Sequence, residues 1–247
     1  MKIIIHGIGG RMGIEVAKLA IGGMRGAQIL AGVDPYGAFD GAPCHKSFDT
    51  VSGVADCIID FSHHSATKAL LDYAVKTGTP VILATTGHTE DELEAIRLAA
   101  EKVAVFHAAN MSLGVALLIE LAKIAARTMP DAEIEIIEKH HDRKLDAPSG
   151  TALAIANALK TVREDAFFTY GRSGQAKRTK EEIGIHAIRL GNIVGEHEVI
   201  VGTDSQTITL KHEAHTRALF AEGALAAAEF IVGKPAGLYS MPDMIKI

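Results

Sequence analysis

Lys2-Ile-Ile-Ile-His6, Gly7-Ile-Gly-Gly-Arg-Met-Gly13 and Ile14-Glu-Val-Ala-Lys-Leu-Ala20 follow one another at the start of the chain and decide its fold. The first run is rich in β-branched residues, which is typical of a strand buried on both faces of a parallel sheet. The third run spaces its apolar residues as a helix does. A glycine turn between them predicts a phosphate cradle, because glycines let the backbone come close and the helix N-terminus faces the anion.

The glycines are spaced as G-x-x-G-x-x-G on Gly7, Gly10 and Gly13, whereas the usual dinucleotide motif is G-x-G-x-x-G. The next predicted strand, residues 28–34, ends in Asp34, about two dozen residues after the glycines. An acid there can accept hydrogen bonds from the ribose of a dinucleotide, although it can also be only a cap or turn residue.

The residues after Asp34 bear on the choice of cofactor. Pro35 and Tyr36 stand where an enzyme that prefers the 2′-phosphorylated cofactor would usually carry Arg or Lys, which favours NADH. Arg11 could still reach the extra phosphate, so the use of NADPH stays open.

Strands are also predicted over residues 57–62, 80–84 and 103–106, with helices over 64–78 and from Thr89 between them. This alternation predicts an α/β fold with a Rossmann-type, doubly wound parallel sheet. Ligands of such sheets gather at the carboxyl ends of the strands, where Thr85, Thr86, Asn110 and Met111 also fall. Each of these four could instead be an ordinary turn residue.

After residue 112 the pattern predicts a second, smaller α+β domain with a mixed, largely antiparallel sheet. Its elements are helices 113–127 and 152–160, strands 132–137, 182–189, 198–201 and 207–212, and a mobile surface loop over 163–180. An Ala-rich helix over 217–232 follows.

Residues 138–152, E-K-H-H-D-R-K-L-D-A-P-S-G-T-A, lie between a predicted strand and a helix. His140 and His141 can exchange a proton near neutral pH, and Lys144 supplies positive charge. Ser149 or Thr151 can cap the helix, whose N-terminus favours anions. We expect this segment to bind a carboxylate-bearing small molecule and to give it a proton, the alternative being a solvated basic loop.

Composition narrows the class of partner. A net charge of −5 and a pI near 6.2 argue against affinity for nucleic acid or an anionic membrane, which leaves a small molecule or another copy of the chain. The two cysteines, Cys44 and Cys57, form neither a disulfide framework nor a zinc motif, so a reducing cytoplasm fits best. The sequence offers neither a secretory signal nor a run of about 20 apolar residues.

Five motifs, residues 138–152 together with G-I-G-G-R-M-G, A-T-T-G, A-A-N-M-S and I-V-G-E-H, resemble the 4-hydroxy-tetrahydrodipicolinate (dihydrodipicolinate) reductase family of lysine and diaminopimelate biosynthesis. The resemblance covers almost the whole chain. It implies a dinucleotide-binding domain of residues 1–112 plus 218–247 and a substrate-binding and oligomerisation domain of residues 113–217. It also implies a homotetramer joined through the sheet of the second domain.

The resemblance assigns catalysis to His140 and Lys144, and substrate binding to His141, Ser149, Gly150, Thr151 and Arg217. The cofactor would contact Gly7, Ile8, Gly9, Gly10, Arg11, Met12, Asp34, Ala84, Thr85, Thr86, Ala108, Ala109, Asn110 and Met111. The sequence departs from the family pattern at Ala84, where glycine is usual, at Met111, where an aromatic residue is frequent, and at Leu190 and Asn192, where Gly and Asp are usual.

The implied reaction transfers a hydride from the nicotinamide to a cyclic dicarboxylate imine, with a proton from His140 and assistance from Lys144. Closure of a cleft between the domains would exclude water.

Two other classes of function compete with this reductase. Twelve histidines could suggest a metal-dependent hydrolase, but HExxH and paired cysteines are missing from the sequence and we expect no metal site. A non-catalytic dinucleotide sensor would need only the glycine turn.

Overall fold

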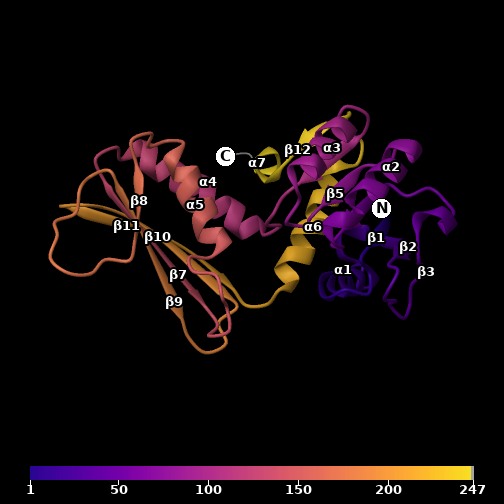
Figure 1. Cartoon of the computed structure of the whole chain (residues 1–247), viewed down its shortest axis with the longest axis horizontal. Coiled ribbons are helices and arrows are strands. Elements are labelled where there is room, and N and C mark those ends of the chain that lie inside the picture. The colour runs from indigo at the N-terminus through magenta and orange to yellow at the C-terminus, as the bar shows by residue number, and fades with distance from the viewer. Residues whose placement is uncertain (246–247) are drawn as a thin grey trace. The chain divides into compact units, whose positions relative to one another are not determined.

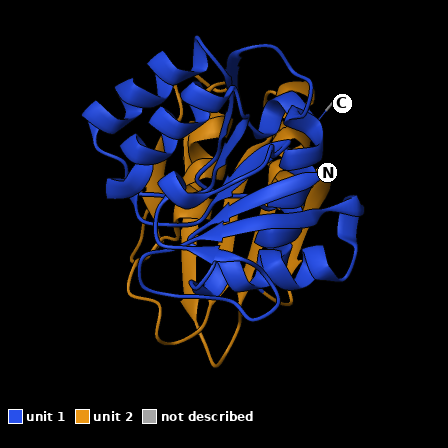
Figure 2. Ribbon diagram, turned by 90° about the vertical axis from the view of Figure 1, so that its right-hand side faces the viewer, with its two compact units in different colours: residues 1–113, 217–246 blue, residues 114–216, 247 orange. Residues whose placement is uncertain are grey.

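The computed structural model describes residues 1–245, which divide into two compact units: residues 1–113 with 217–245, and residues 114–216 (Figures 1 and 2). The boundaries expected from the sequence, 112/113 and 217/218, each differ from this division by one residue. Residues 246–247, which the sequence assigns to the first domain, lie outside the described part.

The first unit is built on a seven-stranded sheet in the order β12-β6-β5-β4-β1-β2-β3, in which all neighbouring strands are parallel. The strands are β1 Lys2–His6, β2 Gln28–Val33, β3 Cys44–His45, β4 Cys57–Asp60, β5 Val81–Leu83, β6 Ala104–His107 and β12 Gly237–Tyr239. The order reverses between β1 and β4, which is where doubly wound sheets bind ligands. The predicted Rossmann-type sheet is therefore confirmed.

Helices cover both faces of this sheet (Figure 1). They are α1 Arg11–Ile21, α2 Thr67–Thr77, α3 Glu90–Ala100, α6 Ala218–Ile231 and the short α7 Met241–Met244, with 3-10 turns at Met24–Gly26, Phe48–Thr50 and His64–Ala66. Ile4, Ile58 and Val105 pack against α2 and α3. Phe106 on β6 meets Phe230 of α6, with ring centroids 6.1 Å apart.

The second unit contains a five-stranded sheet in the order β11-β10-β7-β9-β8, and helices α4 Leu113–Thr128 and α5 Gly150–Lys160. Its strands are β7 Glu133–His140, β8 Phe167–Tyr170, β9 Glu182–Arg189, β10 Gly195–Thr203 and β11 Gln206–Ala214. The sheet is mixed as predicted, but the expectation that it is largely antiparallel is wrong: β10 pairs antiparallel with β7 and β11, whereas β9 pairs parallel with β7 and β8. Helix α5 lies between β7 and β9 in the chain, and such a crossover allows the two strands to run parallel.

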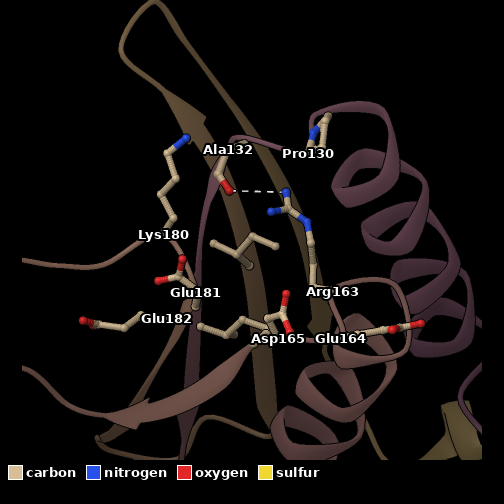
Figure 3. A pocket seen from close by; sticks show the side chains of 11 residues that line it. Pro130, Ala132, Arg163, Glu164, Asp165, Lys180, Glu181 and Glu182 are labelled. Atoms are coloured by element: carbon tan, nitrogen blue, oxygen red, sulfur yellow. Dashed lines mark hydrogen bonds between the residues drawn. The ribbon is translucent and has the colours of Figure 1, made fainter.

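The predicted loop over residues 163–180 is wrong in part, because β8 lies within it. This strand has only four residues, it forms the edge of the sheet, and both its ends are exposed, so it carries little periodic signal. Before it, Arg163 donates to the carbonyls of Ala126 (3.2 Å), Met129 (2.6 Å) and Ala132 (3.3 Å). Figure 3 shows this guanidinium at the wall of a pocket, whose volume is about 250 Å³, where it joins the end of α4 to the loop that precedes β7.

Strand β7 alternates between a buried and a more open face along its whole length. Ile134 and Ile136 enter the core of the second unit with residues of α4 and α5. The same period places Glu138 and His140 on this inner face, where their side chains are buried. The strand pattern thus carries two titratable groups into the interior.

Candidate active site

The glycine turn in the first unit is dictated by close backbone packing. Gly7 has a left-handed φ of +79°, and a Cβ at Gly13 would lie 2.1 Å from the Gly7 carbonyl oxygen. Only glycine fits these positions. The turn leads into α1, whose N-cap is Gly10 and whose first residue is Arg11, so the predicted strand–turn–helix cradle is present.

A cavity of about 470 Å³ opens at the carboxyl edge of this sheet. Seven of the residues that the sequence assigns to the cofactor line it: Arg11, Met12, Ala84, Thr85, Thr86, Ala109 and Met111. The wall also contains Phe61, Ser62, His63, His64 and Phe220, which the sequence analysis does not assign. The first four follow β4 at the predicted edge, so strand order could have suggested them, whereas Phe220 depends on the return of α6.

The other expected cofactor residues lie outside this lining. Ile8 has a fully buried side chain packed toward Gly32, so only its backbone could reach a ligand. Ala108 donates its N–H to Leu83, and Asn110 accepts from the N–H of Ser112 at 2.9 Å. Met111, by contrast, belongs to the cavity lining; it is one of the departures from the family pattern and is only 2 % exposed.

Asp34 organises the loop beside the glycine turn. Its Oδ2 accepts from the N–H of Gly9 at 3.0 Å, and its Oδ1 accepts from the N–H groups of Tyr36 and Gly37, both at 2.9 Å. Such bonds to nearby backbone N–H groups are typical of an aspartate that stabilises a turn. They also fix the carboxylate next to the glycines, where it retains unused acceptor positions.

A buried carboxylate, Asp60, lies behind the cavity wall. It accepts from the hydroxyls of Ser62 (2.6 Å) and Thr85 (2.7 Å), and Nδ1 of His6 lies 2.8 Å away. Burial alone would raise the pKa of Asp60, but His6, Ser62 and Thr85 together lower it. Asp60 is therefore ionised at neutral pH, and it orients two hydroxyls of the wall.

The second unit brings His140 and Lys144 into one electrostatic environment. Burial lowers the pKa of His140, Glu138 acts in the opposite direction, and the charges of Lys144 and Arg189 lower it further. Lys144 Nζ pairs with Asp146 at 2.9 Å, and its side chain is largely buried. A buried imidazole whose pKa is set by these opposing charges can exchange a proton with a bound molecule.

His140 belongs to a cluster of polar side chains that come from β7, β9, β10 and the start of α5. Its Nδ1 lies 2.6 Å from Glu138 Oε2, and Arg189 of β9 donates to both oxygens of Glu138, each at 2.8 Å. The rings of His140 and His197 meet edge to face, with centroids 5.2 Å apart. His197 Nε2 lies 3.0 Å from Ser149 Oγ, and burial, assisted by the charge of His140, lowers the pKa of His197 to about 4.

Glu138, Arg189 and His197 are not predicted as site residues. Glu138 begins the histidine-rich segment and His197 ends I-V-G-E-H, so both lie in motifs that the sequence singles out. Arg189 gives no such signal, because only the pairing of β7 with β9 brings it opposite His140.

The expected substrate residues take different positions. Ser149 is the N-cap of α5 and accepts from the N–H of Ala152 at 3.1 Å, which confirms its predicted capping role. Gly150 and Thr151 form the first turn of that helix, and the His141 N–H donates to Ile193. Arg217 belongs to the first unit, where it is the exposed N-cap residue of α6.

At Asn192, where the sequence departs from the family pattern, the side-chain oxygen accepts a hydrogen bond from Arg143 at 2.6 Å.

Within residues 1–245, no three His, Cys, Asp or Glu side chains are grouped so that they could hold a metal ion. None of the helices in this described range has the length and hydrophobicity needed to span a bilayer.

Comparison with known proteins identifies both halves of the chain. Residues 1–111 match the family model described as "Dihydrodipicolinate reductase, N-terminus", and residues 114–245 match "Dihydrodipicolinate reductase, C-terminus". Among curated relatives, 4-hydroxy-tetrahydrodipicolinate reductase of Caldanaerobacter subterraneus is 45% identical, with 100% of this chain and 98% of the relative covered. The enzyme of the same name from Clostridium novyi is 44% identical, with 99% and 98% covered.

A solved structure agrees with the fold. Dipicolinate-bound dihydrodipicolinate reductase from Paenisporosarcina sp. TG-14 matches with a TM-score of 0.82 at 24% identity, over 97% of each chain. Both family models together span nearly all of the described residues. The chain therefore belongs to the dihydrodipicolinate reductase family of oxidoreductases.

Proposed function

We propose that the protein reduces 4-hydroxy-tetrahydrodipicolinate, through its dehydrated form, to tetrahydrodipicolinate in lysine and diaminopimelate biosynthesis. Two relatives that are 44–45% identical over nearly the whole chain carry the name of this activity. The observation that carries the proposal is the buried His140, held by Glu138 and influenced by the charge of Lys144, in a unit whose fold matches a dipicolinate-bound reductase.

The residues of the first unit fit a reduced pyridine nucleotide. The glycine turn leaves its backbone open at the start of α1, and the cavity of about 470 Å³ continues along the ends of β4, β5 and β6. NADH, when bound, supplies the hydride. Arg11 and the N-terminus of α1 would hold the pyrophosphate, while Thr85 and Met111 would form the wall farther along the sheet.

We propose that NADH is preferred and that NADPH can also be used. Asp34 supports this preference, because its fixed carboxylate would accept from ribose hydroxyls and would repel a 2′-phosphate. Tyr36 beside it is 98% exposed and carries no positive charge. Arg11 is also exposed and can offer charge to a phosphate.

In the second unit, His140 would give the proton that completes the reduction, and Lys144 would stabilise the negative charge that develops on the ring. The first turn of α5, at Gly150 and Thr151, would hold a substrate carboxylate through its N–H groups, with His141 and Arg217 adding charge and Ser149 holding the turn.

We further propose a homotetramer in which the outer face of the second sheet is shared between subunits. Alternation along the strands places Ile137, Ile188 and Ile200 on that face, and Ile188 is 40% exposed in the single chain. Sedimentation equilibrium should give four times the chain mass, and a monomer would contradict the assembly.

Cys44 and Cys57 are both free thiols, which suits a reducing cytoplasm.

A coupled assay tests the function. The ring product of the preceding aldol condensation is supplied with NADH, and the loss of reduced-nicotinamide absorbance is followed. Substrate-dependent oxidation supports the reductase. Binding of NADH with no oxidation in the presence of the authentic dicarboxylate would instead support the dinucleotide sensor.

A further inference from the structure

We propose that Glu138, clamped by Arg189, is the positioning residue for His140: it keeps a proton on Nδ1 and leaves Nε2 as the atom that exchanges a proton with the substrate. The inference rests on the proposed catalytic role of His140. It extends the site to Glu138, Arg189 and Gly195, none of which the sequence analysis assigns.

The carboxylate of Glu138 is fully occupied by donors. Its Oε1 accepts from Arg189 at 2.8 Å and from the N–H of Ser149 at 2.9 Å. Its Oε2 accepts from Arg189 at 2.8 Å and lies 2.6 Å from His140 Nδ1. An ionised carboxylate can only accept, so the hydrogen between Oε2 and Nδ1 must belong to the histidine.

Glu138 is ionised at neutral pH even though its side chain is completely buried. Burial alone would raise its pKa, but hydrogen bonds from Arg189, His140 and Ser149 together lower it. Arg189 keeps its charge at any relevant pH. The buried negative charge is therefore matched by a fixed positive one, and the carboxylate has no reason to take the proton of His140.

The strands and side chains around His140 hold its imidazole and the carboxylate of Glu138 in fixed orientations. Glu138 and His140 are two residues apart on one face of β7, and Arg189 is the register partner of His140 on β9. Arg189 also donates to the carbonyl of Asp146 at 2.6 Å, which holds the guanidinium from a second side. On the other side of the imidazole lies the ring of His197.

Gly195 leaves space at the opposite edge of the imidazole. A Cβ at this position would lie 3.1 Å from His140 Nε2 and 3.5 Å from its Cδ2. Because Nδ1 is held by a short contact to Glu138, the ring could not move away without losing that contact. The glycine of I-V-G-E-H therefore keeps Nε2 accessible.

The proton transfer balances on these atoms. The N–H bond at Nε2 of protonated His140 breaks as a C–H bond forms on the substrate, and His140 becomes neutral while Nδ1 keeps its hydrogen. Glu138 stays ionised and stabilises the charged imidazole that forms when solvent returns the proton. The other charged or titratable groups that influence this imidazole are Lys144 and Arg189, which disfavour its charge, and His197.

Glu138→Gln tests the positioning role, with Glu135→Gln as the matched control. Glu135 lies on the same strand and holds another histidine in a similar way, with Oε2 2.8 Å from His186 Nε2 and Oε1 accepting from Arg178 at 3.0 Å. We expect Glu138→Gln to lower kcat by about 10²- to 10³-fold with NADH affinity unchanged. Glu135→Gln should leave kcat unchanged, and equal losses in both variants would overturn the proposal.

The charge of Glu138 raises the pKa of His140. The pH profile of kcat for Glu138→Gln should therefore shift to lower pH, a change that general loss of structure would not produce. Because Glu138→Gln leaves Arg189 without its partner, the double variant Glu138→Gln/Arg189→Gln removes both charges and provides a second protein for the same profile. Arg189 acts on the pKa of His140 in the opposite direction and less strongly than Glu138, so the double variant should show a smaller shift to lower pH. No shift in Glu138→Gln, or a shift to higher pH in the double variant, would contradict the role of Glu138.

Two-bond ¹H–¹⁵N correlation spectra of the native enzyme test the tautomer without any variant of Glu138. We expect His140 to be protonated on Nδ1 and unprotonated on Nε2 when neutral. The opposite tautomer would overturn the positioning inference even if His140→Ala is inactive. If His140→Ala keeps full turnover, the proposed proton donor itself fails, whichever tautomer is seen.

Gly195→Ala probes the open side of the ring, with Gly202→Ala on the same strand as its control. A Cβ at Gly202 would meet Thr207 Oγ1 at an ordinary 3.5 Å. We expect Gly195→Ala to lower kcat at least about tenfold while NADH affinity is kept, and Gly202→Ala to leave both unchanged. Unchanged turnover in Gly195→Ala would show that Nε2 does not need this space.

Discussion

Thr85 donates its hydroxyl hydrogen to Oδ2 of Asp60 at 2.7 Å, joining the ends of two neighbouring strands behind the cavity at the carboxyl edge of the first sheet. The same carboxylate orients Ser62. The cavity wall is thus set by a residue that the ligand need not touch.

Asp60→Asn should weaken NADH binding by about tenfold to a hundredfold, because an amide would leave at least one of these hydroxyls poorly oriented. Isothermal titration with NADH measures the effect. Asp56→Asn is the control. Asp56 lies at the start of the strand that Asp60 ends, and its side chain accepts from the Lys2 N–H at 2.6 Å. Equal affinity in the wild type and Asp60→Asn would show that the wall does not depend on this carboxylate.

His140→Ala and Lys144→Ala should each lower kcat by about 10²- to 10⁴-fold while the Kd for NADH barely changes, because both residues lie in the second unit. Fluorescence titration of NADH and the coupled assay measure the two quantities separately. His186→Ala, which alters a histidine on the outer face of the same sheet, serves as the control. Normal turnover in both active-site variants would remove them from the mechanism.

The pH dependence of turnover follows from the lowered pKa of His140. A proton donor must be protonated, so kcat should fall as the pH rises through that pKa, below the usual value of about 6.5. Measurement of kcat from acid to neutral pH checks the sign. An activity that rises with pH across this range would assign the proton to another group.

Stability should also depend on pH, through His197. Its pKa is lowered to about 4 in the folded protein, from 6.5. The unfolded chain then binds more protons between these values, so stability is full above pH 6.5 and is lost as the pH falls toward 4, by roughly 3 kcal/mol at most. Urea unfolding at several pH values should show this slope, and His197→Gln should flatten it.

Gly13→Ala should destabilise the glycine turn, because its Cβ would meet a backbone oxygen that cannot move aside. We expect a loss of more than about 3 kcal/mol in the free energy of unfolding. Gly22→Ala, at the other end of α1, places its Cβ 3.4 Å from its nearest neighbours and should be tolerated. Urea denaturation of both variants provides the comparison.

Initial-rate kinetics should show a lower KM for NADH than for NADPH, because Asp34 faces the ribose site in the proposed complex. Asp34→Asn would reduce the repulsion of a 2′-phosphate but would also disturb the amides of Tyr36 and Gly37. We therefore expect the preference to narrow rather than reverse. A clear preference of the native enzyme for NADPH would refute the assignment.

The elements that the sequence predicts well are those that bury long apolar faces. Strand β1, the glycine turn and α1 follow directly from the first twenty residues, and the alternation over β7 predicts its inner face. The two- to four-residue edge strands β3, β8 and β12 have too few residues to show a period.

The cavity of the first unit was predictable because the alternation of strands and helices places separate segments at one edge of the sheet. The residues around His140 were predictable only where they are neighbours in the chain. His140, Lys144 and Ser149 lie in one segment, so composition alone draws attention to them. Arg189 reaches Glu138 across 51 positions, and Thr85 reaches Asp60 across 25. Such pairs depend on which strands lie side by side, and the pattern within one segment does not identify its neighbours in the sheet.

The return of α6 to the first sheet has a consequence for the folding of the chain during translation. Gly223 lies so close to the Met111 carbonyl that a Cβ would come within 1.7 Å of it, and eight residues of α6 are buried. The nascent chain therefore leaves the part of the sheet that α6 covers, over β4, β5 and β6, exposed until residues 218–231 have been translated. The second unit is complete at residue 216, so all of it is translated before the chain can finish the first unit.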